Sequence, residues 1–412
     1  MKRLYLKELI KTQRGATMIF VAICIFVLVA FTALAVDIGH LFVAHNELQN
    51  AADAGALAGA RFLYVNDGQA VNSGANQIAY DAAVANISDN TAVEVIASEV
   101  ERGHWSFITK TFTPNETSLD PVDLWDAPWQ DLDANLNFIN AIRVRTRRQT
   151  TPVQSFFARI FGHQGFEQSA VAVAYIGFAG TLQPLEADMP IVICKEALLF
   201  GGSPTCSIGR MINSGSNVQT HQSGGWTDFN QDNPCSGGTN ASTMKDLVIS
   251  SCPGGGANPE PIIYGKDIAT NGGQVQSAFD RFYNCFHGRS DIDQPLSMVL
   301  PVVTCPSNNI GTCEKVVGAV QVEVVWVTDG GNDPTYTNAP TQTSGWADSN
   351  PDGQIRWQNF VSHFGLQNVD GSPAPYAKKS IYFKPSCEYA EPTGVSGGEN
   401  FGVLAKIPVL VN

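Results

Sequence analysis

ATMIFVAICIFVLVAFTALAV, residues 16–36, is an apolar run of 21 residues without a charge in a chain of 412. A helix rises about 1.5 Å per residue, so a run of this length covers a hydrocarbon core of roughly 30 Å. We therefore predict a transmembrane helix over residues 15–36.

The charges beside the apolar run predict its orientation. Residues 1–14, MKRLYLKELIKTQR, contain five Lys or Arg against one Glu, whereas residues 37–60 contain neither Lys nor Arg. The positive-inside bias makes residues 1–14 a cytoplasmic tail and exports the bulk of the chain. The alternative is a cleaved secretory signal, because ALA at residues 33–35 fits a cleavage pattern. We favour the anchor, since the run is long for a signal and no helix breaker precedes that site.

The helix is expected to continue past the membrane. Apolar residues from Leu34 to Phe62 recur at spacings of three, four and seven, which is typical of an amphipathic helix. Ala51, Gly55 and Gly59 follow one another at every fourth position, which predicts a helix-packing ridge that another helix can approach closely. Two options stay open for that neighbour: a helix of the same domain, or a partner, including a second copy in a homo-oligomer.

Two segments resemble a known family. The first comprises Arg14-Gly15-Ala16, the apolar run, Asp37-Ile38-Gly39 and LQNAADAGALAGA at residues 48–60. It is similar to the N-terminal signature of TadE/TadG-like proteins of the Tad (tight adherence) system, which assembles Flp pili. The second, NAIRVRTRRQTTPVQSFFARIFGHQGFEQSAVAVAY at residues 140–175, resembles the strand, helix and strand that follow the anchor in TadG-like chains.

The resemblance implies a TadG-like, membrane-anchored structural component of Flp (type IVb) pilus assembly and the Tad secretion machinery. It places the chain in the bacterial inner membrane, with its bulk in the periplasm and with other pilus-assembly or pseudopilin subunits as partners. Prepilins of the system carry Glu five residues after the Gly at which they are cut, but Phe20 stands five residues after Gly15. The D-x-S-x-S motif of the von Willebrand A-type domain that ends some TadG-like proteins is absent. These departures argue against prepilin cleavage and against that domain.

Charge and cysteines fit an exported protein. The net charge is −13 although residues 1–14 are basic, so the exported part is acidic and nucleic acid is not expected as a partner. Cys24 lies in the apolar run, and the other eight cysteines follow residue 190. An even number in an exported region predicts disulfides and leaves their pairing open. The candidates are Cys194, Cys206, Cys235, Cys252, Cys285, Cys305, Cys313 and Cys387.

The remaining pattern predicts an α+β protein with two exported parts. Residues 37–180 would form a membrane-proximal α+β domain, with a helix near residues 70–87 and strands at 142–148 and 166–178. Residues 181–412 would form a mainly β, disulfide-bonded domain with few helices, because turn residues separate short β-branched runs there.

Between the strands at 142–148 and 166–178 the sequence predicts a short helix. Pro152 would open it, Gly162 would end it, and an apolar face would lie between them. The members of that face are Phe156, Phe157, Ile160 and Phe161. The preceding strand alternates, with Arg143, Arg145 and Arg147 on one side. We favour a solvated face for these arginines over contact with anionic headgroups or an acidic subunit.

One loop resembles half of a calcium site. Asp348, Asn350 and Asp352 precede Gly353 in the pattern D-x-N-x-D-G, where alternate side-chain oxygens can converge on a hard cation. Asn359 stands where such loops carry Glu, and turns built by Asp and Asn side chains explain the same letters. Calcium is thus the one cofactor that the sequence suggests, and a calcium site is the minority interpretation of this loop.

The common metal-site and nucleotide-binding motifs of catalysis are absent. The sequence contains no H-E-x-x-H or P-loop pattern, and its seven histidines are scattered. We therefore expect a scaffold and not an enzyme. The alternative function is a membrane-anchored binding module or adhesin, which calcium could stabilise. Cell fractionation would distinguish the scaffold from the adhesin.

Overall fold

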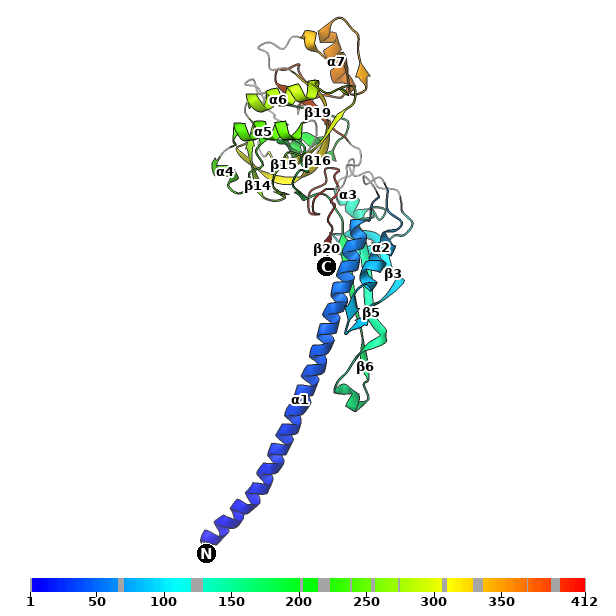
Figure 1. The fold of residues 1–412 in the computed structure, drawn as a ribbon, viewed down its shortest axis with the longest axis vertical. Helices are drawn as coiled ribbons and strands as arrows, with labels where there is room; N and C mark the ends of the chain where they lie inside the picture. Colours follow the sequence, from blue (N-terminus) through cyan, green and yellow to red (C-terminus); the bar gives the residue numbers. More distant parts are fainter. Residues whose placement is uncertain are drawn as a thin grey trace.

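The computed structural model describes residues 2–65, 70–119, 129–200, 203–213, 223–237, 239–252, 256–272, 275–305, 310–328, 336–368, 370–386 and 393–411. Side chains are described there except for residues 2–16, 129–130, 203–204, 237 and 250–251. One long helix leads from the N-terminus into an α+β domain, and a strand-rich domain lies beyond it (Figure 1). The predicted α+β class is confirmed.

The long helix, α1, runs without interruption from Lys2 to Arg61. In its exposed half, which we define as residues 18–36, large apolar side chains such as Phe26 and Leu28 lie open to the surroundings. In its packed half, residues 44–61, one face is buried, with Leu48 and Ala52 fully covered. The helix is long and apolar enough to cross a membrane.

The membrane-proximal domain is a sheet covered by helices. Its five strands lie in the order β20-β6-β5-β3-β4, and every neighbouring pair is antiparallel. The packed half of α1 and the shorter α2 share a core with this sheet, and that core includes Ala79, Ile142 and Val144. The elements are α2 (Ala75–Val84), β1 (Ile87–Ser88), β2 (Thr91–Ala92), β3 (Glu94–Ser106), β4 (Thr111–Pro114), α3 (Trp129–Ala134), β5 (Ala141–Gln154), η2 (Ala158–Phe161), β6 (Gly165–Tyr175) and β20 (Val409–Val411).

The distal domain is built on a seven-stranded sheet in the order β11-β19-β16-β14-β12-β8-β15. A further pairing of β15 with β16 closes five of these strands into a ring. Its strands are β8 (Ile191–Cys194), β11 (Arg210–Asn213), β12 (Gly224–Thr227), β14 (Asp267–Asn271), β15 (Leu296–Val303), β16 (Cys313–Val327) and β19 (Ser380–Pro385). Two-stranded ribbons use β7 (Thr181–Leu182), β9 (Leu199–Phe200), β10 (Ser203–Pro204), β13 (Ile262–Ile263), β17 (Gln342–Thr343) and β18 (Trp346–Ala347).

Helices cover this sheet. α6 packs Phe279, Phe282 and Phe286 into the main core, and α7 packs Trp357 and Phe360 into a second aromatic core. The helical spacing of Val275, Ala278, Phe279 and Phe282 predicts α6. The sequence analysis does not predict α5 or α7, although Trp357, Phe360 and Val361 have the same spacing in α7. The helices and turns are η3 (Lys195–Leu198), α4 (Pro234–Gly237), α5 (Ala241–Ser251), α6 (Gln276–His287), η4 (Tyr336–Asn338) and α7 (Gly353–His363).

The chain returns to the membrane-proximal domain at its C-terminal end. β20 pairs with β6, with Val409 opposite Tyr175. Before it, backbone hydrogen bonds join Ala179 to Val403 and Ala405 to Gly177, with N···O distances of 3.0 and 2.7 Å. The sequence analysis places residues 181–412 in one distal domain, whereas the last strand, β20, belongs to the first sheet. The membrane-proximal sheet therefore contains residues from both ends of the exported region.

Candidate anchoring site and its supports

The packed half of α1 contacts α2 through glycines. A Cβ atom added at Gly55 would lie 2.8 Å from Ala83 Cβ, and one added at Gly59 would lie 2.6 Å from Ala79 Cβ. Both distances are shorter than van der Waals contact, so the helices approach each other closely only because these side chains are missing. Ala51, on the same ridge, is buried in a small core with Leu48 and Val93.

The sequence leaves two neighbours open for this ridge, and the structure places the chain's own domain there. α2 and β5 occupy the ridge, and Gly55 and Gly59 are buried. A homo-oligomer formed through this face would have to displace α2, so the partner option finds no free surface here.

A turn beside α2 also fastens α1. Asp89 and Asn90 connect β1 and β2 with positive φ angles of 49° and 57°. The Asp89 carboxylate lies 3.0 Å from His40 Nε2, and the Asp89 backbone N–H donates to Glu47 Oε2 at 2.7 Å. These contacts fix the part of α1 between its exposed and packed halves.

Asp37 connects α1 to the β5–β6 hairpin through several hydrogen bonds. Its two carboxylate oxygens accept hydrogen bonds from the backbone N–H groups of Phe156, Phe157 and Ala158 at 2.6–3.2 Å. These three residues begin the tip of the β5–β6 hairpin, which we define as residues 155–164. Asp37 is the first charged residue after the apolar run, and it is buried. The carboxylate therefore ties the hairpin tip to the point where the exposed half of α1 ends.

The predicted short helix is wrong in its extent. β5 continues through Pro152 to Gln154, and only the 3₁₀ turn η2 forms, ended as expected by Gly162 in a left-handed conformation with φ 93°. The apolar side chains are not buried on the domain. A four-residue turn offers no helical face, and its hydrogen bonds to Asp37 replace those of a helix.

A second carboxylate, that of Glu94, stabilises a β-bulge in the same β5–β6 hairpin. The pairing of β5 with β6 shifts between Arg148 and Val153, which leaves intervening N–H groups unpaired by the ladder. Glu94 accepts from the backbone N–H groups of Gln149, Thr150 and Thr151 at 2.7–3.1 Å. Partial burial raises the pKa of Glu94, but the hydrogen bonds from Thr150 and Thr151 outweigh it and lower the pKa to about 2.

The arginine row of β5 pairs mainly with β3. Arg143 donates to Glu101 and lies over the Phe112 ring, with its guanidinium carbon 4.8 Å from the ring centroid. Arg147 forms an ion pair with Glu99. These contacts favour a solvated, salt-bridged sheet face over a free basic surface, while Arg145 remains exposed.

Three disulfides confirm the predicted crosslinking of the distal domain. They join Cys194 to Cys305, Cys235 to Cys313 and Cys252 to Cys285, with Cα–Cα distances of 5.5, 5.1 and 6.0 Å. Cys206 is disulfide-bonded as well, Cys387 lies outside the described residues, and Cys24 is a free, exposed thiol. Because their loops span 111, 78 and 33 residues, these crosslinks restrict the unfolded chain strongly.

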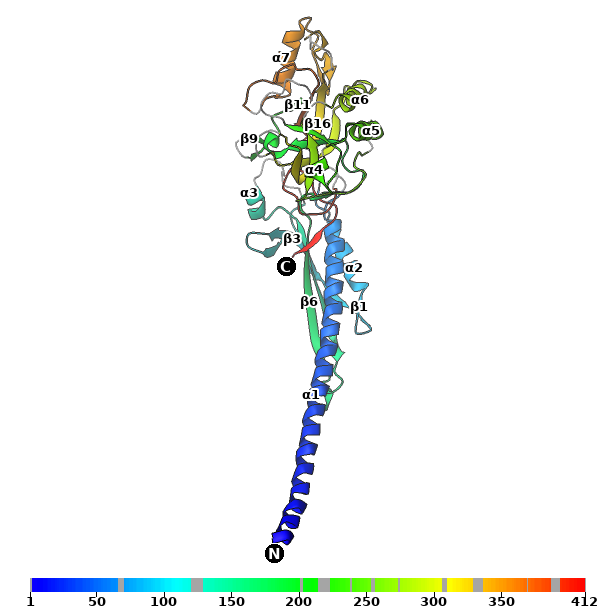
Figure 2. The same ribbon diagram turned by 90° about the vertical axis from the view of Figure 1, so that its left-hand side faces the viewer.

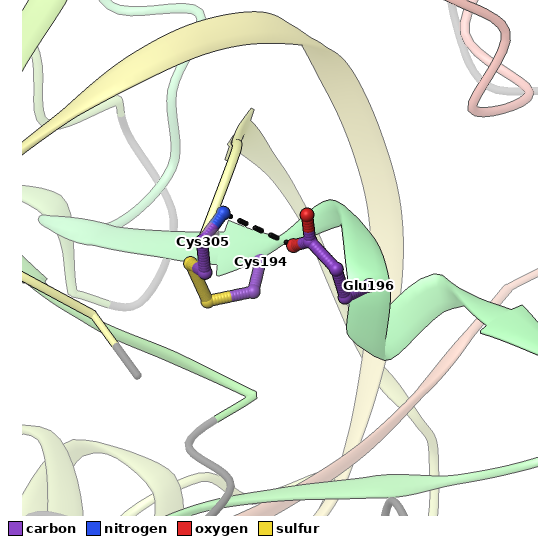
Figure 3. Close-up of side chains that lie close together, drawn as sticks. All are labelled: Cys194, Glu196 and Cys305. Carbon is purple, nitrogen blue, oxygen red and sulfur yellow. Dashed lines mark hydrogen bonds between the residues drawn. A yellow bond between two sulfur atoms is a disulfide. The ribbon is translucent and has the colours of Figure 1, made fainter. Parts of the chain in front are cut away.

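Cys194, Glu196 and Cys305 form the one close group of three metal-ligating side chains among the described residues. Figure 3 shows the two sulfurs bonded to each other and the Glu196 carboxylate turned to the Cys305 backbone N–H, at 3.1 Å. Sulfur in a disulfide is not a thiolate, and metal ligation needs the thiolate. This group is a structural crosslink with a hydrogen-bonded carboxylate beside it.

The suggested calcium loop uses its oxygens within the chain. Asp348 accepts from the Asn350 backbone N–H at 2.8 Å and from the Asn359 side chain at 2.8 Å, and Asn350 accepts from the Asp352 N–H at 2.9 Å. Asp352 caps α7 by accepting from the Gln354 N–H at 2.8 Å. The hydrogen bond from Asn359, followed by the one from Asn350, lowers the pKa of Asp348. Calcium at Asp348, Asn350 and Asp352 stays a prediction.

A hollow of about 350 Å³ lies beside α7. Trp357, Val361, Leu366 and Pro373 are among its lining residues, and the described lining contains no titratable side chain. General acid–base chemistry requires such a group within reach of a substrate, and the described lining of this hollow offers none.

The long helix and the sheet packed on it define a class: a chain whose N-terminal apolar helix is also a core element of the α+β domain that follows. The putative Flp pilus-assembly TadE/G-like family matches residues 15–61, and the putative Tad-like Flp pilus-assembly family matches residues 58–174. The resemblance to TadE/TadG-like proteins is thereby confirmed over residues 15–174. Comparison with curated proteins finds no match, and comparison with solved structures finds none.

Proposed function

We propose that this protein is a TadG-like, membrane-anchored structural component of Flp pilus assembly. In this proposal the exposed half of α1 lies in the inner membrane, residues 1–14 lie in the cytoplasm, and both exported domains lie in the periplasm. The protein acts as a scaffold and not as an enzyme, and its partners are other pilus-assembly or pseudopilin subunits.

One observation carries the proposal. Together the two pilus-assembly matches span residues 15–174, which include most of α1, all of α2, β3, β4 and β5, and β6 up to its last residue. The matched region therefore comprises the long helix and four of the five strands of the sheet packed on it, and only β20 lies outside it. The basic residues 1–14 and the absence of Lys and Arg from residues 37–60 support the orientation.

The distal domain lies outside both matches, and it is the natural place for contacts that differ between assemblies. Its disulfides and its closed ring of strands make it a rigid body held away from the exposed half of α1 (Figures 1 and 2). A rigid body on a short anchor suits a scaffold. It also suits the alternative, a binding module or adhesin presented by the same anchor.

Fractionation of cells that make the pilus tests the proposal. We expect the full chain in the inner-membrane fraction, its absence from sheared filaments, and loss of surface pili when the gene is deleted and restored when the full chain is supplied. Recovery of the chain in sheared filaments or in the outer membrane, with pili unaffected by the deletion, would contradict the proposal and favour the adhesin.

A further inference from the structure

The hairpin tip carries an apolar surface that the protein leaves uncovered. The exposed fractions of its four large apolar side chains are 50% for Phe156, 39% for Phe157, 75% for Ile160 and 81% for Phe161. Other large apolar side chains of the membrane-proximal domain, such as Ile142 and Val144, are buried in the core beneath α1 and α2. Four adjacent exposed groups of this size indicate a contact surface.

The position of the tip identifies what this surface meets. Asp37, which binds the backbone of residues 156–158, directly follows the apolar run. Figures 1 and 2 both show the tip beside α1 and pointing along it toward the N-terminal end. Close to Asp37 in the sequence, α1 exposes Leu34 and Ile38, each 56% accessible, so both α1 and the tip expose large apolar side chains near the Asp37 contact.

From these observations we propose that the hairpin tip inserts into the outer interface of the same lipid bilayer that α1 spans. The inference rests on the membrane anchoring proposed above. Ile160 and Phe161 enter the boundary between acyl chains and headgroups, and Arg159, the one Lys or Arg in residues 149–166, reaches the headgroup phosphates.

Asp37 has a defined part in this arrangement. Backbone N–H groups that approach a lipid phase need hydrogen-bond acceptors, because water is scarce there. Its carboxylate supplies acceptors for three of them and sets the depth of the tip relative to α1. Asp37 is thus a positioning residue, and the hairpin becomes a second attachment that fixes the tilt and rotation of the domain on the membrane.

Nitroxide labels report the depth directly. The wild-type thiol of Cys24 carries the label in the apolar run, and Phe161→Cys in a Cys24→Ser background carries it at the tip. Ile108→Cys in the same background is the matched control, because Ile108 is 63% exposed in the turn between β3 and β4, at the opposite end of the sheet. Each full chain is reconstituted in vesicles of phosphatidylethanolamine and phosphatidylglycerol, and collisions with oxygen and with a water-soluble nickel chelate are measured by power saturation.

We expect oxygen to dominate over the chelate at positions 24 and 161, and the chelate to dominate at position 108. Chelate dominance at 161 with oxygen dominance at 24 would overturn the inference and leave the anchor intact. Chelate dominance at 24 would overturn both. Dipolar broadening at 161 that disappears on dilution with unlabelled chain would show a second copy on the tip and would also overturn the inference. If Phe161→Cys does not fold, Ile160→Cys takes its place.

Discussion

The two halves of α1 have the same secondary structure and opposite surroundings. In residues 18–36 large apolar side chains point outward in all directions, whereas in residues 44–61 alanines, leucines and glycines are buried against α2 and the sheet. The difference lies in side-chain size: close helix packing needs small residues, and contact with lipid needs only apolar ones. One helix can therefore be an anchor and a core element at once, provided that its residue sizes change along its length.

The largest expected effect comes from a charge in the exposed half. Leu28→Arg should reduce membrane insertion by roughly 2.5–3.5 kcal/mol, because a buried guanidinium is costly in the hydrocarbon centre. The fraction resistant to carbonate extraction measures it. Ala54→Arg is the matched control, since Ala54 is exposed in the packed half. Equal loss of membrane retention in both variants would remove the distinction between the halves.

The next effect concerns the glycines. Gly59→Ala should lower the free energy of unfolding of the full chain in detergent by about 1–3 kcal/mol, because its methyl group would overlap Ala79 Cβ. Gly39→Ala meets no atom within 4 Å and should be neutral or slightly stabilising. Thermal unfolding followed by circular dichroism compares the two. A harmless Gly59→Ala would mean that α2 does not pack on this face.

Glu94 gives the membrane-proximal sheet a dependence on pH. Its folded pKa, about 2, lies below the ordinary value of 4.5, so the unfolded state binds protons more readily. Its contribution is complete above pH 4.5 and is lost as the pH falls from there toward 2. After a discount for solvent screening we expect about 1 kcal/mol. Glu94→Gln should flatten this part of the stability profile. An unchanged slope would show that other groups set it.

The smallest effect is expected far from α1, at α7. Asp352→Ala removes an N-cap and should cost about 1 kcal/mol, whereas millimolar calcium should leave the melting temperature of the wild type unchanged. A calcium-dependent rise in that temperature, absent in Asp348→Asn, would establish the ion site and revise the account of this loop.

The local sequence pattern predicts α1, β5, β6 and α6, because residues close in the sequence determine the secondary structure of each element. It does not predict what joins them. Asp37 finds its partners 119–121 positions away, and Val409 pairs with Tyr175 across most of the distal domain. The same limit applies to the disulfides, because Cys194 in β8 and Cys305 after β15 come together only when these two strands pair. The hairpin tip shows the limit most clearly: its apolar residues are evident in the sequence, but their exposure is not.

Asp37 is the residue of the anchoring site whose role the sequence does not reveal, although the signal exists. It is the first carboxylate after a long apolar run, at a position where a charge in contact with lipid would be unfavourable without partners. A carboxylate at such a boundary indicates that N–H groups from elsewhere in the chain bind it. Glu94, within the sheet, likewise accepts hydrogen bonds from backbone N–H groups that are distant in the sequence.

The central claim is that residues 18–36 remain part of the protein and hold it in the membrane. The intact mass of the chain extracted from cell membranes tests it most directly, together with labelling after denaturation of Cys24, the free thiol among the described residues. We predict one species that contains residues 15–36 and takes up a thiol label at Cys24. A soluble species that begins near Val36 and takes up none would contradict it.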